Sequence, residues 1–257
     1  MDKLLQEYII KWQLHVAGGI KVSSRNFVLP VIYNSQPAVL KIAREGNEDI
    51  SAAYYNYVGG QGAAQIYLHE NSAILIERLD AKPALKDLPE EGQDNLACNI
   101  IAKVIKDLHR ASGERPQNLP TLKSKFKPLL ESGNNILAKE LLENPLNEVV
   151  LHGDITHENI MNSGRGWLAI DPKPVLGEAA YEVAAALCHP NTVPHLVHDA
   201  KRMSFCADIY AKELRQDKKR LLQFACVYSE LMALQAADDA DEMAYWSKCA
   251  EVAAGLV

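Results

Sequence analysis

Two short apolar runs rich in branched residues, 149–151 and 168–170, enclose a polar loop, and this arrangement limits the fold more than any other feature of the chain. Runs of this length bounded by polar residues predict two buried strands. Three polar side chains follow in order: Asp154 and Asn159 in the loop, and Asp171 after the second run. The pattern therefore predicts that two strands hold a carboxylate, an amide and a second carboxylate in one site.

The order of these side chains is typical of phosphoryl transfer from ATP to a hydroxyl group. The proton of the attacking hydroxyl must pass to a carboxylate that stays ionised near neutral pH, and Asp154 suits that role. The Mg²⁺ that bridges the phosphates prefers hard oxygen ligands, which an amide and a carboxylate on adjacent elements supply. We therefore predict Asp154 as the proton acceptor, Asn159 and Asp171 as magnesium ligands, and ATP and Mg²⁺ as cofactors.

The residues of the loop also fit two other interpretations. Asp154 and Asn159 could serve only local turns, because such residues favour loops. His152, Asp154 and His157 could instead supply three ligands to zinc. The combination of spacing, flanking strands and Asp171 favours the phosphoryl-transfer site over both, and a hydrolytic metal site would leave Asp171 unexplained.

The first 80 residues favour strands around one helix, whereas helical periodicity dominates the remainder. Short apolar runs separated by turn residues predict an antiparallel sheet from 27–33, 38–43, 64–69 and 73–79. A helix-length segment, 45–58, interrupts these strands and ends at Gly59 and Gly60, as helices commonly do. We therefore predict an α+β fold with an N-terminal lobe over residues 1–80 and a helical C-terminal lobe over residues 81–257.

Apolar positions at helical spacing locate the helices of the second lobe. Residues 81–89 are expected to form a loop, followed by a core helix over 96–108. Further helices are expected over 122–143, around 179–188 and through most of 196–256.

The amino-acid composition argues against several kinds of binding partner. Acidic residues outnumber basic ones by 33 to 27, giving a formal net charge of −6, so no general basic field exists to hold nucleic acid. No apolar run approaches the ~20 residues that cross a bilayer, and the first residues lack a basic region followed by an apolar stretch. We therefore expect a cytoplasmic protein with no nucleic-acid or membrane partner. The five cysteines are scattered without a CxxC pair, which predicts neither a disulfide nor a zinc site.

Two linked motifs resemble those of the aminoglycoside phosphotransferases, most closely the branch of streptomycin 6-phosphotransferases and hydroxyurea kinases. The first is the polar loop, His152-Gly153-Asp154-Ile155-Thr156-His157-Glu158-Asn159. The second joins Ile170-Asp171-Pro172-Lys173-Pro174 to Gly177-Glu178-Ala179-Ala180-Tyr181-Glu182-Val183-Ala184. Short stretches of the smaller lobe agree as well, so the resemblance covers roughly residues 20–190.

The resemblance implies a protein-kinase-like bilobal fold, with ATP between a small antiparallel-sheet N-lobe and a larger helical C-lobe. Lys41 would bond the α- and β-phosphates, and an acid on the following helix would pair with it. Glu48 is our choice for that acid, with Glu45 and Asp49 as competitors. The pairing would also compensate an ammonium group that lies between apolar neighbours on a strand.

Two further parts of the ATP site follow from the resemblance. The backbone of the linker at residues 77–80, which includes Glu77 and Leu79, would bond the adenine edge. The segment expected to cover the phosphates, 22–26, contains no glycine, so side chains such as Ser24 would contribute where backbone amides of a Gly-rich loop normally do.

The resemblance makes an aminoglycoside such as streptomycin the leading acceptor, with antibiotic resistance as the associated role. Hydroxyurea or a cellular metabolite is the alternative, because the acceptor region matches least. The acidic run 238–242 would complement a cationic aminoglycoside, although a solvated turn between helices is the simpler interpretation. A nucleotide-binding pseudokinase is the alternative from another class, disfavoured because every expected catalytic position is filled.

Overall fold

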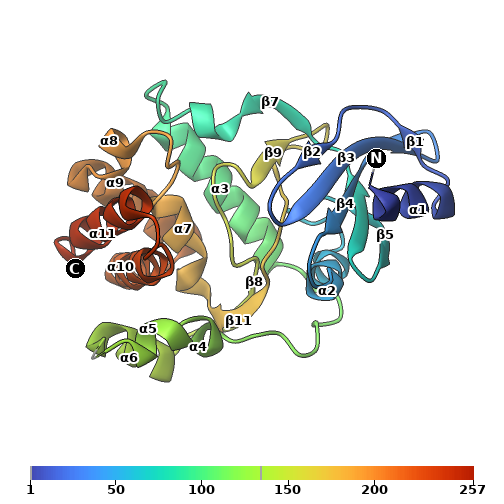
Figure 1. The fold of residues 1–257 in the computed structure, drawn as a ribbon. Coiled ribbons are helices and arrows are strands. Elements are labelled where there is room, and N and C mark those ends of the chain that lie inside the picture. Colours follow the sequence, from blue (N-terminus) through green and yellow to red (C-terminus); the bar gives the residue numbers. More distant parts are fainter. Residues whose placement is uncertain (1, 134) are drawn as a thin grey trace.

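An antiparallel sheet forms most of the N-terminal part of the computed structural model, which describes residues 2–133 and 135–257 (Figure 1). Its strands follow the order β1-β3-β4-β6-β5, and β2 pairs with β3. The predicted strands 27–33, 38–43 and 73–79 correspond to β3, β4 and β6, and the run 64–69 begins later than predicted, as β5. The elements of this part are α1 (Lys3–Lys11), β1 (His15–Val16), β2 (Lys21–Val22), β3 (Asn26–Tyr33), β4 (Gln36–Ala43), α2 (Asp49–Val58), β5 (Ile66–Glu70) and β6 (Ala73–Glu77).

The two faces of β4 have different neighbours. Successive side chains of a strand point to opposite faces, and Leu40 and Ile42 are buried in a cluster with Leu5 and Tyr8 of α1. Lys41 therefore points to the other face. The alternation of this one strand places an ammonium group on the side of the sheet away from α1.

Helix α2 begins later than the sequence pattern predicted. Gly46 has a positive φ of 78°, and the helix starts at Asp49 rather than at residue 45. Its end agrees with the prediction: Gly59 adopts the left-handed conformation, with φ 57°, and its N–H donates to the Tyr55 carbonyl oxygen.

The C-terminal part is mainly helical, and two predictions about its first segments are wrong. A strand, β7, and a short 3-10 helix occupy the segment 81–89 that was expected to be a loop, and the strand pairs with β9. The boundary of the two lobes at residues 80 and 81 stays a prediction. Leu96, expected in the core, is 48% exposed. The first elements of this part are β7 (Asp80–Ala84), η1 (Leu85–Asp87), α3 (Asp94–His109), β8 (Glu148–Leu151), β9 (Ile160–Asn162), β10 (Leu168–Ala169) and β11 (Val175–Glu178).

The described residues of the predicted helix over 122–143 form three short helices instead, α4 (Leu122–Lys125), α5 (Lys127–Glu131) and α6 (Ile136–Glu143). Pro128 explains the first break, because proline has no N–H to donate and is tolerated only in the first turn of a helix. Asn135 explains the later restart, since its side chain caps α6 by accepting from Ala138 N–H at 2.8 Å. Local signals thus override a continuous apolar periodicity.

The last helices pack together on the side of the molecule opposite the β1–β6 sheet, with α3 between (Figure 1). Helix α10 lies against α11, α7 and α9. None of the helices in the described part of the chain is both long and apolar enough to cross a membrane. These elements are η2 (Ala179–Val183), α7 (Ala184–Leu187), α8 (Pro194–Val197), α9 (Ala200–Leu214), α10 (Lys218–Gln235) and α11 (Ala240–Ala254).

Candidate active site

Lys41 lies between two carboxylates. Its Nζ is 2.9 Å from Glu48 Oε1 and 2.5 Å from Asp171 Oδ1, and only 13% of its side chain is exposed. Burial on its own would lower the pKa of Lys41, but the charges of Asp171 and Glu48 outweigh it and hold the pKa above its ordinary value. Of the competitors considered for this pairing, Asp49 lies instead 3.0 Å from His69 Nε2. Lys41 is therefore a fixed cation.

Asp171 follows β10 in an unusual backbone conformation. Its φ is 55°, which is uncommon for a residue with a side chain, and its N–H donates to the hydroxyl oxygen of buried Tyr55 at 3.0 Å. Burial would raise the pKa of Asp171, but Lys41 outweighs burial and holds that pKa below its ordinary range. Asp171 is thus an ionised carboxylate whose backbone is held by Tyr55 and whose side chain is held by Lys41.

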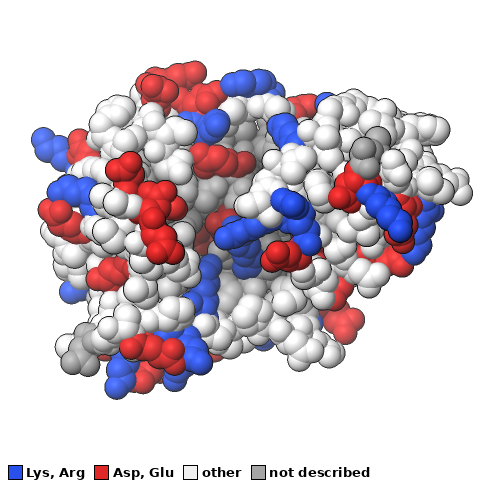
Figure 2. Space-filling model, in the orientation of Figure 1, with Lys and Arg blue, Asp and Glu red and all other residues white. Residues whose placement is uncertain are grey.

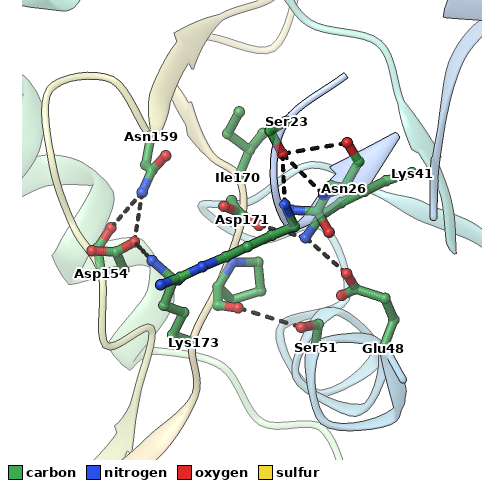
Figure 3. Close-up of polar contacts among 12 residues, drawn as sticks. Ser23, Asn26, Lys41, Glu48, Ser51, Asp154, Asn159, Ile170, Asp171 and Lys173 are labelled. Carbon is green, nitrogen blue, oxygen red and sulfur yellow. Dashed lines mark hydrogen bonds and ion pairs between the residues drawn. The ribbon is translucent and has the colours of Figure 1, made fainter. Parts of the chain in front are cut away.

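The polar loop, residues 152–159, connects β8 to β9 and carries Asp154 beside Asn159 (Figure 3). Asn159 Nδ2 donates to Asp154 O at 2.9 Å and to Asp154 Oδ2 at 3.1 Å. Ile170 N–H in turn donates to the Asn159 carbonyl oxygen at 2.8 Å, so the loop is joined to the segment that leads to Asp171. Asp154, Asn159 and Asp171 are therefore brought together, as the sequence predicted they would be.

A buried carboxylate holds the start of the polar loop. Glu182 Oε2 accepts from His152 N–H at 2.9 Å, Glu182 Oε1 accepts from Gly153 N–H at 2.9 Å, and His109 Nε2 lies 3.2 Å from Oε2. Burial would raise the pKa of Glu182, but the hydrogen bond and charge of His109 outweigh it and keep the pKa low. The backbone before Asp154 is therefore fixed by an ionised group.

His152 is structural. Its Nε2 lies 3.0 Å from the Ile170 carbonyl oxygen, and its Nδ1 lies 3.4 Å from Asp154 N. A carbonyl oxygen only accepts, so Nε2 carries the hydrogen and Nδ1 accepts from the amide. Burial lowers the pKa of His152, which favours this neutral form. Both ring nitrogens face backbone groups, an arrangement unlike that of a zinc ligand.

His157 completes the comparison with a zinc site. The side chain is 2% exposed, and burial, followed by Arg202 and His189, lowers its pKa well below the ordinary value. Among residues 2–133 and 135–257, no group of three or more His, Cys, Asp or Glu side chains is placed to hold a metal ion.

A cavity of about 460 Å³ opens beside these groups. Ser24 lines this cavity together with Lys41, Glu48 and Asp171. The neighbouring Ser23 is used within its own turn, where its Oγ accepts from Asn26 N–H at 2.9 Å (Figure 3). Acidic and basic side chains both border the hollow between the two parts of the molecule (Figure 2).

The linker predicted to bond adenine is clamped from the C-terminal part. Arg165, between β9 and β10, pairs with the Glu77 carboxylate and donates to the carbonyl oxygen of Gly60 at 2.9 Å. The Glu77 N–H donates to Gln65 O at 2.7 Å. Within the described residues, the Leu79 N–H has no protein acceptor, and its bond to adenine stays a prediction.

Three site residues were not assigned from the sequence. Arg165 carried no signal, because its partner Glu77 is far away in the chain. Glu182 lies in the second of the two motifs, where it had no assigned role. Lys173 lies in the same motif, and its Nζ pairs with Asp154 Oδ2 (Figure 3). Its position between two prolines beside Asp171 was the available signal.

Comparison with known proteins agrees with this geometry. A family model described as aminoglycoside/hydroxyurea antibiotic resistance kinase matches residues 11–240. The streptomycin 3''-kinase of Klebsiella pneumoniae is 33% identical over 190 residues, which are 70% of this chain and 71% of that protein. The streptomycin 6-kinase of Streptomyces griseus is 26% identical over 209 residues, which are 73% of this chain and 66% of that protein.

A solved structure extends the comparison to the fold. A thermostable mutant of the aminoglycoside phosphotransferase APH(4)-Ia, in complex with ADP and hygromycin B, superposes with a TM-score of 0.64 at 12% identity, covering 98% of each chain. The predicted kinase-like α+β fold is thereby confirmed. The predicted enzyme class, an ATP-dependent phosphotransferase acting on small molecules, is confirmed by the family match. The chain belongs to the family of aminoglycoside and hydroxyurea antibiotic resistance kinases.

Proposed function

We propose that this protein transfers the γ-phosphate of ATP to a hydroxyl group of streptomycin or a related aminoglycoside. The observation that carries the proposal is that Lys41 and Asp171 line one cavity, and that Lys173, which also lines it, contacts Asp154 beside Asn159. The two streptomycin kinases among the relatives support the choice of acceptor. Hydroxyurea, which the family description also names, is the second candidate.

The chemistry follows from the positions of the side chains. Lys41, held by Glu48, would align the α- and β-phosphates, and the Leu79 N–H would bond adenine. Asp154 would accept the proton of the acceptor hydroxyl while the new P–O bond forms and the bond to the β-phosphate breaks, leaving ADP. Most of the acceleration would come from positioning and from neutralising charge.

The residues present fit a magnesium ion. The Asn159 amide nitrogen already donates to Asp154, so its oxygen is the atom left for a ligand. Asp171 engages Lys41 through Oδ1 and retains a second oxygen. Hard oxygens, few in number and completed by phosphates and water, are what Mg²⁺ takes in kinases. When held there by Asn159 and Asp171, the ion would neutralise charge on the phosphates.

The turn between α10 and α11 supports a cationic acceptor. Asp239 is partly used as the cap of α11, where it accepts from Asp241 N–H at 3.1 Å, while Asp238 and Asp241 are exposed. Figure 2 shows acidic side chains gathered beside the hollow on the side where Figure 1 places this turn. An acidic rim would attract an aminoglycoside and leave uncharged hydroxyurea unaffected.

The test is a transfer assay with purified protein, ATP and Mg²⁺ against streptomycin, hygromycin B and hydroxyurea, read by the mass increase of one phosphoryl group. Streptomycin is expected to be modified, with a KM that rises with ionic strength because its charges are screened. Modification of hydroxyurea alone, with no dependence on salt, would move the assignment to the second candidate. ATP binding without modification of any acceptor would identify a nucleotide-binding protein that has lost turnover.

Replacing Glu48 with glutamine is expected to lower kcat/KM for ATP about 10- to 100-fold, the factor that ~1.5–3 kcal/mol of a charge-assisted hydrogen bond represents. The loss arises because Lys41 keeps only Asp171 to hold it. Asp49→Asn is the matched control: it removes a carboxylate from the next residue, which contacts His69 instead. Equal losses in both variants would contradict the assignment of Glu48.

A further inference from the structure

Lys173 is a cation of the cavity whose side chain is largely accessible to solvent, as is the neighbouring Arg25. The Lys173 side chain is 53% exposed, compared with 13% for Lys41. Lys41 pairs with two carboxylates, whereas the described partner of Lys173 Nζ is Asp154 alone. The two lysines line the same cavity. Of these two lysines, Lys41 is therefore held by two carboxylates, whereas Lys173 is held by one and is the more exposed.

The backbone of Lys173 is fixed although its head group is not. Its N–H donates to the His152 carbonyl oxygen at 2.9 Å. A β-carbon added at Gly153, whose φ is 77°, would clash with the Lys173 carbonyl oxygen, so the two backbones touch where only glycine fits. Pro172 and Pro174 restrict the chain on both sides. A long flexible side chain thus begins at a fixed point beside Asp154.

Lys173 lies beside two carboxylates of the site. Its Nζ contacts Asp154, and it lines the same cavity as Asp171. Lys173 is the exposed partner of this ion pair, with 53% of its side chain exposed compared with 18% for Asp154, and water weakens such contacts. The contact with Asp154 can therefore be exchanged for one with a more highly charged anion. The triphosphate of ATP, entering the cavity that Lys173 lines, is such an anion.

We propose that Lys173 is a catalytic residue that leaves Asp154 when ATP binds and places its ammonium group on the transferring γ-phosphoryl group. This inference rests on the proposed function. The ammonium group of Lys173 stabilises negative charge on the phosphoryl oxygens as the bond to the acceptor oxygen forms and the bond to ADP breaks. Its departure uncovers the Asp154 oxygen that takes the hydroxyl proton.

The experiment compares Lys173→Ala and Lys173→Arg with wild type in two measurements. In turnover with ATP, Mg²⁺ and streptomycin, Lys173→Ala is expected to lower kcat about 100-fold, as removal of one donor to a transition-state anion does, and Lys173→Arg is expected to retain much of it. In calorimetric titration, Lys173→Ala should weaken AMP-PNP roughly tenfold and leave ADP unchanged, since only the former carries a γ-phosphate. Lys11→Ala is the matched control, because Lys11 is 50% exposed and pairs with one carboxylate, Glu70.

Two results would overturn the inference. A fall in kcat with an unchanged preference for AMP-PNP over ADP would show that Lys173 only positions Asp154. If Lys173→Ala has the same turnover and nucleotide affinity as Lys11→Ala, then Lys173 only forms a surface ion pair. If wild type phosphorylates no acceptor, the proposed function is wrong. The titrations with AMP-PNP and ADP would then still show whether Lys173 contacts the γ-phosphate.

Discussion

Replacing Asp154 with asparagine is expected to lower kcat about 1,000-fold, within the 10²- to 10⁴-fold range of a lost general base. The amide keeps the size of the side chain but does not take up the hydroxyl proton. Asn159 should stay in place, because it also donates to the backbone oxygen of residue 154 at 2.9 Å. The loss should therefore report proton transfer rather than a displaced metal ligand.

The measurement is steady-state turnover with streptomycin, accompanied by titration with ADP. Binding of ADP should match wild type, because Asp154 lies outside the contacts proposed for adenine and the α- and β-phosphates. Retention of more than about a tenth of kcat would remove Asp154 from the role of base, since a positioned base contributes at least about 100-fold. Loss of ADP affinity would indicate that the site had collapsed.

Replacing Glu182 with alanine is expected to reduce the free energy of unfolding by about 3–5 kcal/mol, the usual cost of removing one partner from a buried charged pair. Two backbone N–H groups at the start of the polar loop would lose their acceptor, and His109 would lose its carboxylate. The change is measured by urea denaturation at neutral pH. Glu213→Ala is the control, since Glu213 also pairs with a residue of α3, Lys106, but at the surface, and its midpoint should barely move.

The contribution of Glu182 has a defined pH dependence. Its pKa in the folded protein lies below the ordinary value of 4.5, so the folded state favours the ionised form. The stabilisation is therefore complete above about pH 4.5 and is lost as the pH falls through the lower, folded pKa. Wild type should lose stability in that acidic range more steeply than Glu182→Gln. Parallel curves for the two proteins would show that the charge of Glu182 is not what holds the loop.

The polar loop could be predicted from sequence because its chemistry is local. Asp154 and Asn159 are five residues apart, and Asp171 follows a second apolar run, so strand and loop signals alone bring them together. Lys41 and Glu48 needed the family resemblance, because a lysine on a strand is ordinarily a solvent-facing residue. Their pairing depends on how α2 packs against the sheet, which no short pattern encodes.

The predictions that were wrong also have physical causes. Strand β7 is polar and contains Pro83, and it exists because β9, about 80 residues later, pairs with it. The helix predicted over 122–143 failed because apolar periodicity continues across Pro128, while the backbone does not. Glu182 and Arg165 are important through partners far away in the chain, and single residues of this kind carry no periodic signal.

The contact between Gly153 and the Lys173 carbonyl has a consequence for how such a protein can diversify. Because the two main chains touch without an intervening side chain, the spacing of the loop with Asp154 from the segment with Asp171 is a property of the backbone. Side chains elsewhere around the cavity can be exchanged without altering that spacing. Acceptor preference can then evolve while the reaction centre is inherited unchanged, and a saturation library should find Gly153 intolerant even where its surroundings are permissive.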